Sequence, residues 1–240
     1  GEKHVDKMLL ELISFNADEL EEKQIRIEDL PKIQTAERVN WLNIIGLHET
    51  QHMRAIGDQF QIHNLALEDI LNVNQRPTFD EYDEQYFIAT KMIRTVDSAV
   101  LSEQISMIIG EGFIITFQEK EGDIFDGVRN RLRNTKGRIR SKGSDYLSFA
   151  LLDVIVDHYM VIIEEYGAEI NDQEIKLMDN FEREMINDIN LSKKEVNYLR
   201  KYARPLRDTV LNFNKSDNSL IQQETRPFLK DLVEHITPVN

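Results

Sequence analysis

The stretch IHNLALEDILNVNQRPTFDEY, residues 62–82, organises the rest of the chain. Asn64 is a good N-cap for a short helix. Four apolar residues have the spacing to pack inward from this helix: Leu65, Ala66, Ile70 and Leu71. The helix has to end before Pro77, because the residue that precedes a proline is driven out of the α region. Residues 78–82 are then free to form an extended strand.

The adjacent acids Glu68 and Asp69 lie at the centre of this stretch. Judged alone, such a pair is typical of any exposed helix end. Its surroundings are more specific. Residues 41–93, WLNIIGLHETQHMRAIGDQFQIHNLALEDILNVNQRPTFDEYDEQYFIATKMI, closely resemble the cytosolic domain of the CorA-type magnesium transporter family. In that family LEDIL followed by QRP is a long and specific signature.

Composition narrows the classes of partner. The 240 residues carry a formal net charge of −14, and the pI is near 4.9. Nucleic acid is therefore not expected as a partner, because phosphate binding requires a positive field. A group of arginines has no aromatic residue interleaved for base stacking: Arg129, Arg131, Arg133, Arg138 and Arg140. The chain has no cysteine, which excludes disulfides, thiolate metal sites and cysteine nucleophiles and suits a reducing compartment.

Hydrophobic periodicity predicts a mixed N-terminal half. The expected strands are 8–15, 25–30, 41–45, 78–82, 86–95, 104–109 and 113–118, and the expected helices are 17–23, 48–60, 64–71 and 126–134. Gly110 and Gly112 favour a tight hairpin between the last two strands.

The sequence of the C-terminal half predicts helices and no strands. Residues 146–163 are apolar enough to suggest a membrane span. Asp153 and Asp157 would each cost about 2.5–3.5 kcal/mol in mid-bilayer, which favours a buried helix of a soluble domain. An acidic amphipathic continuation is expected to about residue 188. A capping box at residues 192–195 predicts the start of the next helix, and Pro227 lies in the first turn of the last one.

The predicted fold is therefore of the α+β or α/β class. A mixed central sheet flanked by helices, an α/β/α sandwich, is followed by long acidic helices and the start of a stalk helix. We expect three segments: an α/β cytosolic domain at 1–143, a long acidic helical hairpin at 144–215, and the beginning of a stalk helix at 224–240. The 240 residues contain neither the two membrane helices of the family nor its Gly-Met-Asn signature. This fragment is expected not to transport ions by itself.

The resemblance also implies a regulatory metal site between subunits. Its ligands fall on Glu68, Asp69 and Asp153 of one subunit and on Asp231 of the neighbour, with Asp69 and Asp231 as the leading pair. Asp157 is a further candidate, because it lies one helical turn after Asp153. Asp231 and His235 are also one turn apart. Mg²⁺ prefers such oxygen ligands, and Co²⁺ or Ca²⁺ is expected to substitute.

The resemblance implies a metal-sensing domain of a homopentameric Mg²⁺/Co²⁺ channel-transporter at the cytoplasmic face of the cell membrane, with no enzyme activity. Two carboxylates about 5 Å apart repel by roughly 3 kcal/mol at an effective dielectric near 20, and less where water and salt screen them. A dication bound between subunits removes that repulsion. High magnesium is then expected to favour the closed state. Whether the parent moves Mg²⁺, Co²⁺, Ni²⁺ or Zn²⁺ stays open.

Three alternatives follow from the sequence. His48-Glu49-Thr-Gln-His52 matches the HExxH pattern of zinc hydrolases, in which two histidines bind zinc and the glutamate activates water. A Zn²⁺ transporter of the same superfamily is the second. A soluble scaffold without a metal role is the third, but it leaves the coincidence of four acids unexplained.

Overall fold

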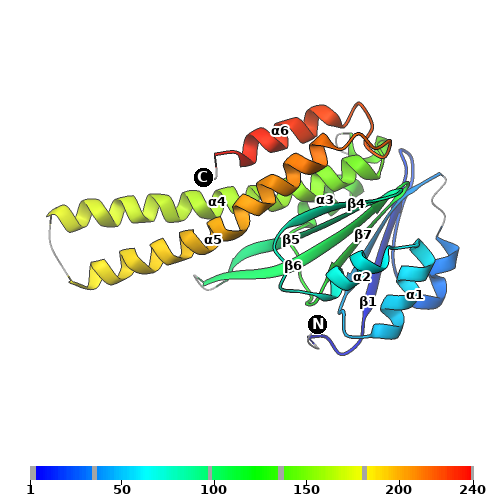
Figure 1. Ribbon diagram of the computed structural model, residues 1–240, viewed down its shortest axis with the longest axis horizontal. Coiled ribbons are helices and arrows are strands. Elements are labelled where there is room, and N and C mark those ends of the chain that lie inside the picture. Colours follow the sequence, from blue (N-terminus) through cyan, green and yellow to red (C-terminus); the bar gives the residue numbers. More distant parts are fainter. Residues whose placement is uncertain (1–3, 34–36, 97–98, 135–137, 180–182, 239–240) are drawn as a thin grey trace.

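A seven-stranded mixed sheet forms the centre of the computed structural model, which describes residues 4–33, 37–96, 99–134, 138–179 and 183–238 (Figure 1). Its strand order is β2-β1-β3-β7-β6-β5-β4. The strands are β1 (Leu9–Phe15), β2 (Leu20–Ile25), β3 (Val39–Ile45), β4 (Thr78–Tyr82), β5 (Gln85–Val96), β6 (Ala99–Gly110) and β7 (Phe113–Gln118). Only β3 and β7 pair in parallel within this sheet, and all its other neighbours are antiparallel. The predicted mixed sheet is confirmed.

Helices cover both faces of the sheet, as the predicted sandwich requires (Figure 1). One face is covered by α1 (Thr50–Phe60), α2 (Asn64–Leu71) and a short 3₁₀ helix, η1 (Ile27–Lys32). The other is covered by α3 (Asp126–Arg133), a 3₁₀ turn η2 (Ile139–Ser141) and the first half of α4 (Ser144–Asp179). The remaining helices, α5 (Arg183–Lys215) and α6 (Arg226–Ile236), pack on α4, and α5 also packs on β4 and β5 of the sheet.

Side chains that alternate between the two faces of each strand form two hydrophobic cores, one on each side of the sheet. In β3, Leu42 and Ile44 are buried beneath α1 and α2, whereas Trp41 is buried on the side of α4. Successive side chains of a strand point to opposite faces, so a strand covered on both sides is apolar at nearly every position. This is why β3, β7 and the second half of β6 are mostly apolar.

Two predicted elements near the N-terminus are wrong. Residues 17–23 were expected to be helical, but residues 20–25 form the edge strand β2, in which Lys23 lies opposite Leu12 of β1. Pairing with β1 overrides the helix propensity of its glutamates, and charged side chains suit a sheet edge. Residues 25–30 were expected to be a strand, but 27–32 form η1. Its apolar residues recur every third position, at Ile27, Leu30 and Ile33, which matches the 3₁₀ period.

The helix that carries the acid pair is confirmed, with two corrections. His63 rather than Asn64 is the N-cap, and its Nδ1 accepts a hydrogen bond of 3.2 Å from the Leu65 amide. Leu65 does not pack inward, since 57% of it is exposed. Ala66 and Ile70 are buried, and Leu71 is half-buried beside them. One turn of packing is enough to fix the orientation of this short helix.

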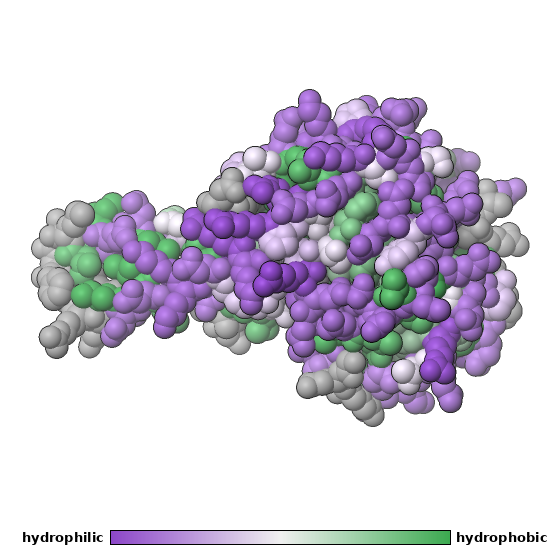
Figure 2. Space-filling view, in the orientation of Figure 1, coloured by the Kyte–Doolittle hydropathy of each residue, from purple (hydrophilic) through white to green (hydrophobic). Residues whose placement is uncertain are grey.

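The long helices α4 and α5 form an antiparallel pair that extends beyond the sheet (Figure 1). The capping box at 192–195 does not begin α5, which already includes Ser192 and starts at Arg183. Ile189 is buried, so the apolar stripe against α4 continues upstream of the capping residues. Figure 2 shows hydrophobic residues toward the free end of this hairpin. Ile175 and Leu191, with exposed fractions of 53% and 60%, lie in this part.

One helix among the described residues, at 144–177, is long and apolar enough to cross a membrane. Of its most apolar window, 61% is buried inside the fold. Leu147, Leu151 and Ile155 belong to the core between this helix and the sheet. Its apolar character is therefore used in packing. The division of the chain at residues 143, 215 and 224 stays a prediction.

Ile155 is fully buried between α4 and the sheet, so Ile155→Ala should lower the free energy of unfolding by about 2–5 kcal/mol. The matched control is Val161→Ala on the same helix, which is 52% exposed and should change it by less than about 0.5 kcal/mol. Urea unfolding followed by circular dichroism measures both. Equal effects of the two variants would contradict the packing described here.

Candidate metal centre

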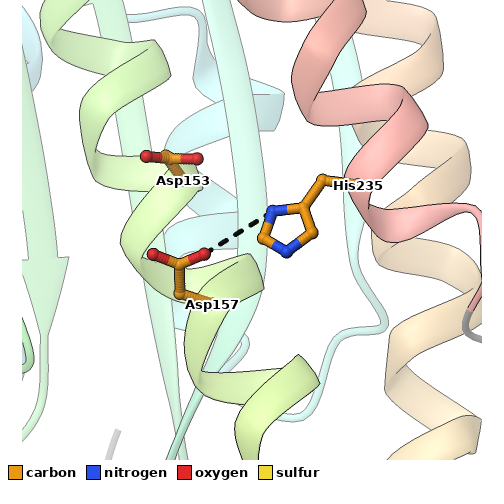
Figure 3. A group of neighbouring side chains, drawn as sticks. All are labelled: Asp153, Asp157 and His235. Carbon is orange, nitrogen blue, oxygen red and sulfur yellow. Dashed lines mark ion pairs between the residues drawn. The ribbon is translucent and has the colours of Figure 1, made fainter.

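Two helices bring three ligand-type side chains together: Asp153 and Asp157 of α4, and His235 of α6 (Figure 3). One ligand atom from each lies within 4.8 Å of the others. His235 Nδ1 lies 3.5 Å from Asp157 Oδ1. Asp153 is half-buried, and the other two are exposed.

Helix periodicity produces this arrangement. Ile155 and Tyr159 bury one side of α4, which leaves Asp153 and Asp157, four residues apart, on a shared flank. In α6, Leu229, Leu232 and Ile236 are buried. Of the positions between them, Asp231 and His235 are exposed and Val233 is half-buried. The two flanks meet where α6 packs against α4.

The charges in this cluster act on each other. Burial raises the pKa of the Asp153 carboxyl, and the negative charge of Asp157 raises it further. His235 and Arg131 act in the opposite direction, whereas Asp231 adds to the increase in that pKa. Asp231 is thus close enough to Asp153 in the same chain to affect its protonation. A dication would be favoured here, because it neutralises carboxylates that repel one another.

The donor set suits a divalent cation. Mg²⁺ accepts one or two carboxylates and keeps several waters, which this exposed cluster permits. An imidazole nitrogen adds affinity for Co²⁺, Ni²⁺ and Zn²⁺, which bind nitrogen more strongly than Mg²⁺ does. The sequence predicts that His235 shares a helix face with Asp231, but His235 was not among the predicted ligands. Its spacing of four from Asp231 was the available signal.

The predicted acids Glu68 and Asp69 lie elsewhere, on α2. Asp69 accepts a hydrogen bond from the side chain of Gln75. The backbone N–H of Gln75 donates to Gln104 Oε1 at 3.1 Å. Gln104 also donates to the Asn72 carbonyl at 3.0 Å. Buried Lys91 donates to the Val73 carbonyl at 2.6 Å. Polar side chains of the sheet thus hold the turn after α2 and, through Gln75, orient Asp69.

One chain does not gather all the predicted ligands. Within the described ranges, the single group of three or more ligand-type side chains includes neither Glu68 nor Asp69. Their helix packs on one face of the sheet, and α4 packs on the other. Asp153 and Asp157 are brought together as the sequence suggested. The pairing of Asp69 with Asp231 of a neighbouring subunit stays a prediction.

The HExxH segment does not have the geometry of a zinc hydrolase. Helix α1 begins at Thr50, so His48 precedes the helix and does not share a helical face with His52. Glu49 Oε1 accepts from the Met8 amide at 2.7 Å, and its Oε2 lies 2.7 Å from His52 Nδ1. The glutamate therefore fastens the N-terminal segment to α1. The three side chains are not among the described groups whose ligand atoms converge.

Sequence comparison assigns this fold to a class of proteins, the CorA-like Mg²⁺ transporters. The sequence profile described as "CorA-like Mg2+ transporter protein" matches residues 36–240, and the chain belongs to this family. It is 35% identical to the cobalt/magnesium transport protein CorA of Thermotoga maritima, covering 97% of this chain and 67% of that protein. It is 26% identical to the putative metal ion transporter YfjQ of Bacillus subtilis, covering 82% of this chain and 60% of that protein.

Solved structures share the fold. The soluble domain of CorA from Methanocaldococcus jannaschii aligns with a TM-score of 0.72 at 18% identity, covering 95% of this chain and 88% of that one. The cytoplasmic domain of ZntB from Vibrio parahaemolyticus aligns with a TM-score of 0.73 at 15% identity, covering 97% and 89%. Membership of a transporter family is consistent with the expected lack of enzyme activity.

The raised pKa of Asp153 has a consequence for stability. The folded chain holds this proton more tightly than the unfolded chain, so stability falls as pH rises from the ordinary carboxyl pKa through the raised value. In metal-free buffer, Asp153→Asn should therefore raise the free energy of unfolding near neutral pH and change it little below about pH 3. Chemical unfolding across this pH range measures the difference.

The matched control is Glu164→Gln at an exposed acid on the same helix, which should change the free energy of unfolding by less than about 0.5 kcal/mol. Millimolar Mg²⁺ should stabilise the wild type more than Asp153→Asn. An equal gain in both proteins would contradict a role of Asp153 in cation binding.

Proposed function

We propose that this chain is the metal-sensing regulatory domain of a CorA-like channel-transporter, and that cations bound between its subunits favour the closed state. The observation that carries the proposal is the convergence of Asp153, Asp157 and His235, with Asp231 beside them, at the contact of α4 with α6. The exposed pair Glu68 and Asp69 supplies a second acidic surface, and Gln75 orients Asp69.

In this proposal, Asp231 of one subunit faces Asp69 of its neighbour, and Glu68 and Asp153 complete the site. Because α6 carries Asp231 and runs along α4, a change at the interface moves the helix that leads toward the stalk. Low magnesium leaves the acids unneutralised and separates the subunits. High magnesium joins them.

The free energy that is needed to switch between two states favours a ring of subunits over a single interface. Moving a two-state equilibrium from 1:99 to 99:1 requires about 5.5 kcal/mol of differential binding. One screened carboxylate pair supplies on the order of 1–3 kcal/mol. Five interfaces of a homopentamer therefore reach the required range, whereas one does not. This arithmetic is the physical reason for proposing an oligomeric sensor.

Membership of the CorA-like family supports the remaining parts of the proposal. The domain lies at the cytoplasmic face of the cell membrane, and membrane helices beyond residue 240 carry the pore. The regulatory ion is Mg²⁺, with Co²⁺ or Ca²⁺ able to substitute. The T. maritima relative is named for cobalt and magnesium, so these ions are the proposed substrates. The likeness to ZntB is one of fold alone and does not choose Zn²⁺.

Limited proteolysis of the full-length protein tests the sensor. Millimolar Mg²⁺ should slow cleavage of the wild type severalfold, because bound cations hold the subunits together. Asp69→Asn and Asp231→Asn should each lose most of this protection. The matched control is Glu234→Gln, an exposed acid on the same helix as Asp231, which should keep it.

Unchanged Mg²⁺-dependent protection in both Asp69→Asn and Asp231→Asn would overturn the proposed inter-subunit site. Protection that is lost equally in Glu234→Gln would show a general effect of acidic charge and would also count against it.

A further inference from the structure

A cavity of about 690 Å³ lies where the sheet meets the helices, and its lining includes none of the candidate metal-binding acids. Its walls come from four places: the end of β1 with the chain entering β3, the turn between β6 and β7, η2 with the segment that leads into α4, and the connection between α5 and α6. The connection between α5 and α6 contributes Leu220 and Gln222 to the lining.

Arg140 is the unusual residue of this cavity. Only 8% of it is exposed, and its Nε donates to the Asn16 carbonyl at 2.9 Å. Its Nη2 is buried and has no hydrogen-bond partner among the described residues. A buried guanidinium nitrogen without an acceptor is costly, and native structures rarely leave one. Arg129, by contrast, is paired with Asp123 and Asp126.

Two further cations lie at the cavity rim. Arg38 is paired with Glu19 and Lys142 with Glu224, and the two glutamates are largely exposed. Exposed ion pairs are weak, so an incoming anion competes with them at little cost. The amino terminus of α4, a helix of 36 residues, forms part of the wall and also favours negative charge.

Acids also line the cavity, but they do not satisfy Arg140. Glu37 and Glu111 are exposed at its edge. Asp145 is buried, and its Oδ2 accepts from the Gln222 amide at 2.9 Å. That contact ties the start of α4 to the connection before α6. Negative charge is thus directed to the rim and to a backbone amide, and Arg140 Nη2 has no acceptor among the described residues.

We propose that this cavity binds a small molecule through an oxyanion, a carboxylate or a phosphate group, with Arg140 as its central donor. A guanidinium matches the planar fork of a carboxylate and the oxygens of a phosphate. Lys142 and Arg38 add charge at the rim. Because Gln222 belongs to the wall, the bound anion links the sheet to the connection that precedes α6.

Thermal unfolding of the chain in sodium phosphate and, separately, in sodium citrate tests this site, with sodium chloride at matched ionic strength as the reference. At least one of the two oxyanions should raise the melting temperature with a saturable dose dependence. Arg140→Gln should weaken the apparent affinity at least tenfold. The matched control, Arg54→Gln at an exposed arginine of α1, should not change it. The better of the two probes distinguishes a phosphate site from a carboxylate site.

Lys142→Gln provides an independent variant if Arg140→Gln fails to fold, and it should weaken binding severalfold because its charge lies at the rim. The proposal is overturned if both oxyanions stabilise the chain no more than sodium chloride. It is equally overturned if a folded Arg140→Gln binds as tightly as the wild type, or if Lys142→Gln does so when Arg140→Gln cannot be obtained.

Discussion

The burial of α4 is the constraint on which the rest of the structure depends. Its apolar side completes the core on one face of the sheet, and its length carries it beyond the sheet as one half of the helical hairpin. Asp153 and Asp157 cannot turn away from α6 without removing Ile155 and Tyr159 from that core. The helix is about 54 Å long at 1.5 Å per residue, so the same rigid element joins the sheet to the far end of the hairpin.

Rigid placement is what makes the acids useful. Freely mobile carboxylates would move apart and lose their need for a counterion, whereas these are held near one another by packing or by hydrogen bonds. Burial gives Asp153 a raised pKa, and Gln75 orients Asp69 from a turn that is fixed by Lys91 and Gln104. Two independent parts of the fold thus present negative charge at fixed positions. Their connection through a neighbouring subunit is the proposed step.

The sequence predicted the fold well where period and pattern were strong. Mostly apolar segments predicted β3, β7 and the second half of β6, and the apolar stretch after Ser144 predicted the first half of α4. It failed where tertiary contacts override local preference. Strand β2 has a helical composition, and only its pairing with β1 decides its conformation. The capping residues at 192–195 carry a valid local signal, but packing of Ile189 against α4 continues the helix upstream of them.

The site was predictable in part for the same reason. Spacing of four residues placed Asp153 with Asp157 on one flank, but sequence spacing alone could not show that α6 lies against that flank. His235 therefore entered the cluster only through the packing of Leu229, Leu232 and Ile236. The position of Glu68 and Asp69 on the opposite side of the sheet was likewise invisible to a linear pattern. One chain brings Asp153, Asp157 and His235 together, whereas the whole proposed site requires residues of two subunits.

The most direct test is the position of the cation in the assembled full-length protein. Anomalous scattering from crystals grown with Mn²⁺ in place of Mg²⁺ locates it without reference to activity. The account predicts a peak between Asp69 of one subunit and Asp231 of the next. Ordered density for both side chains with no peak at either carboxylate, under saturating Mn²⁺, would contradict it.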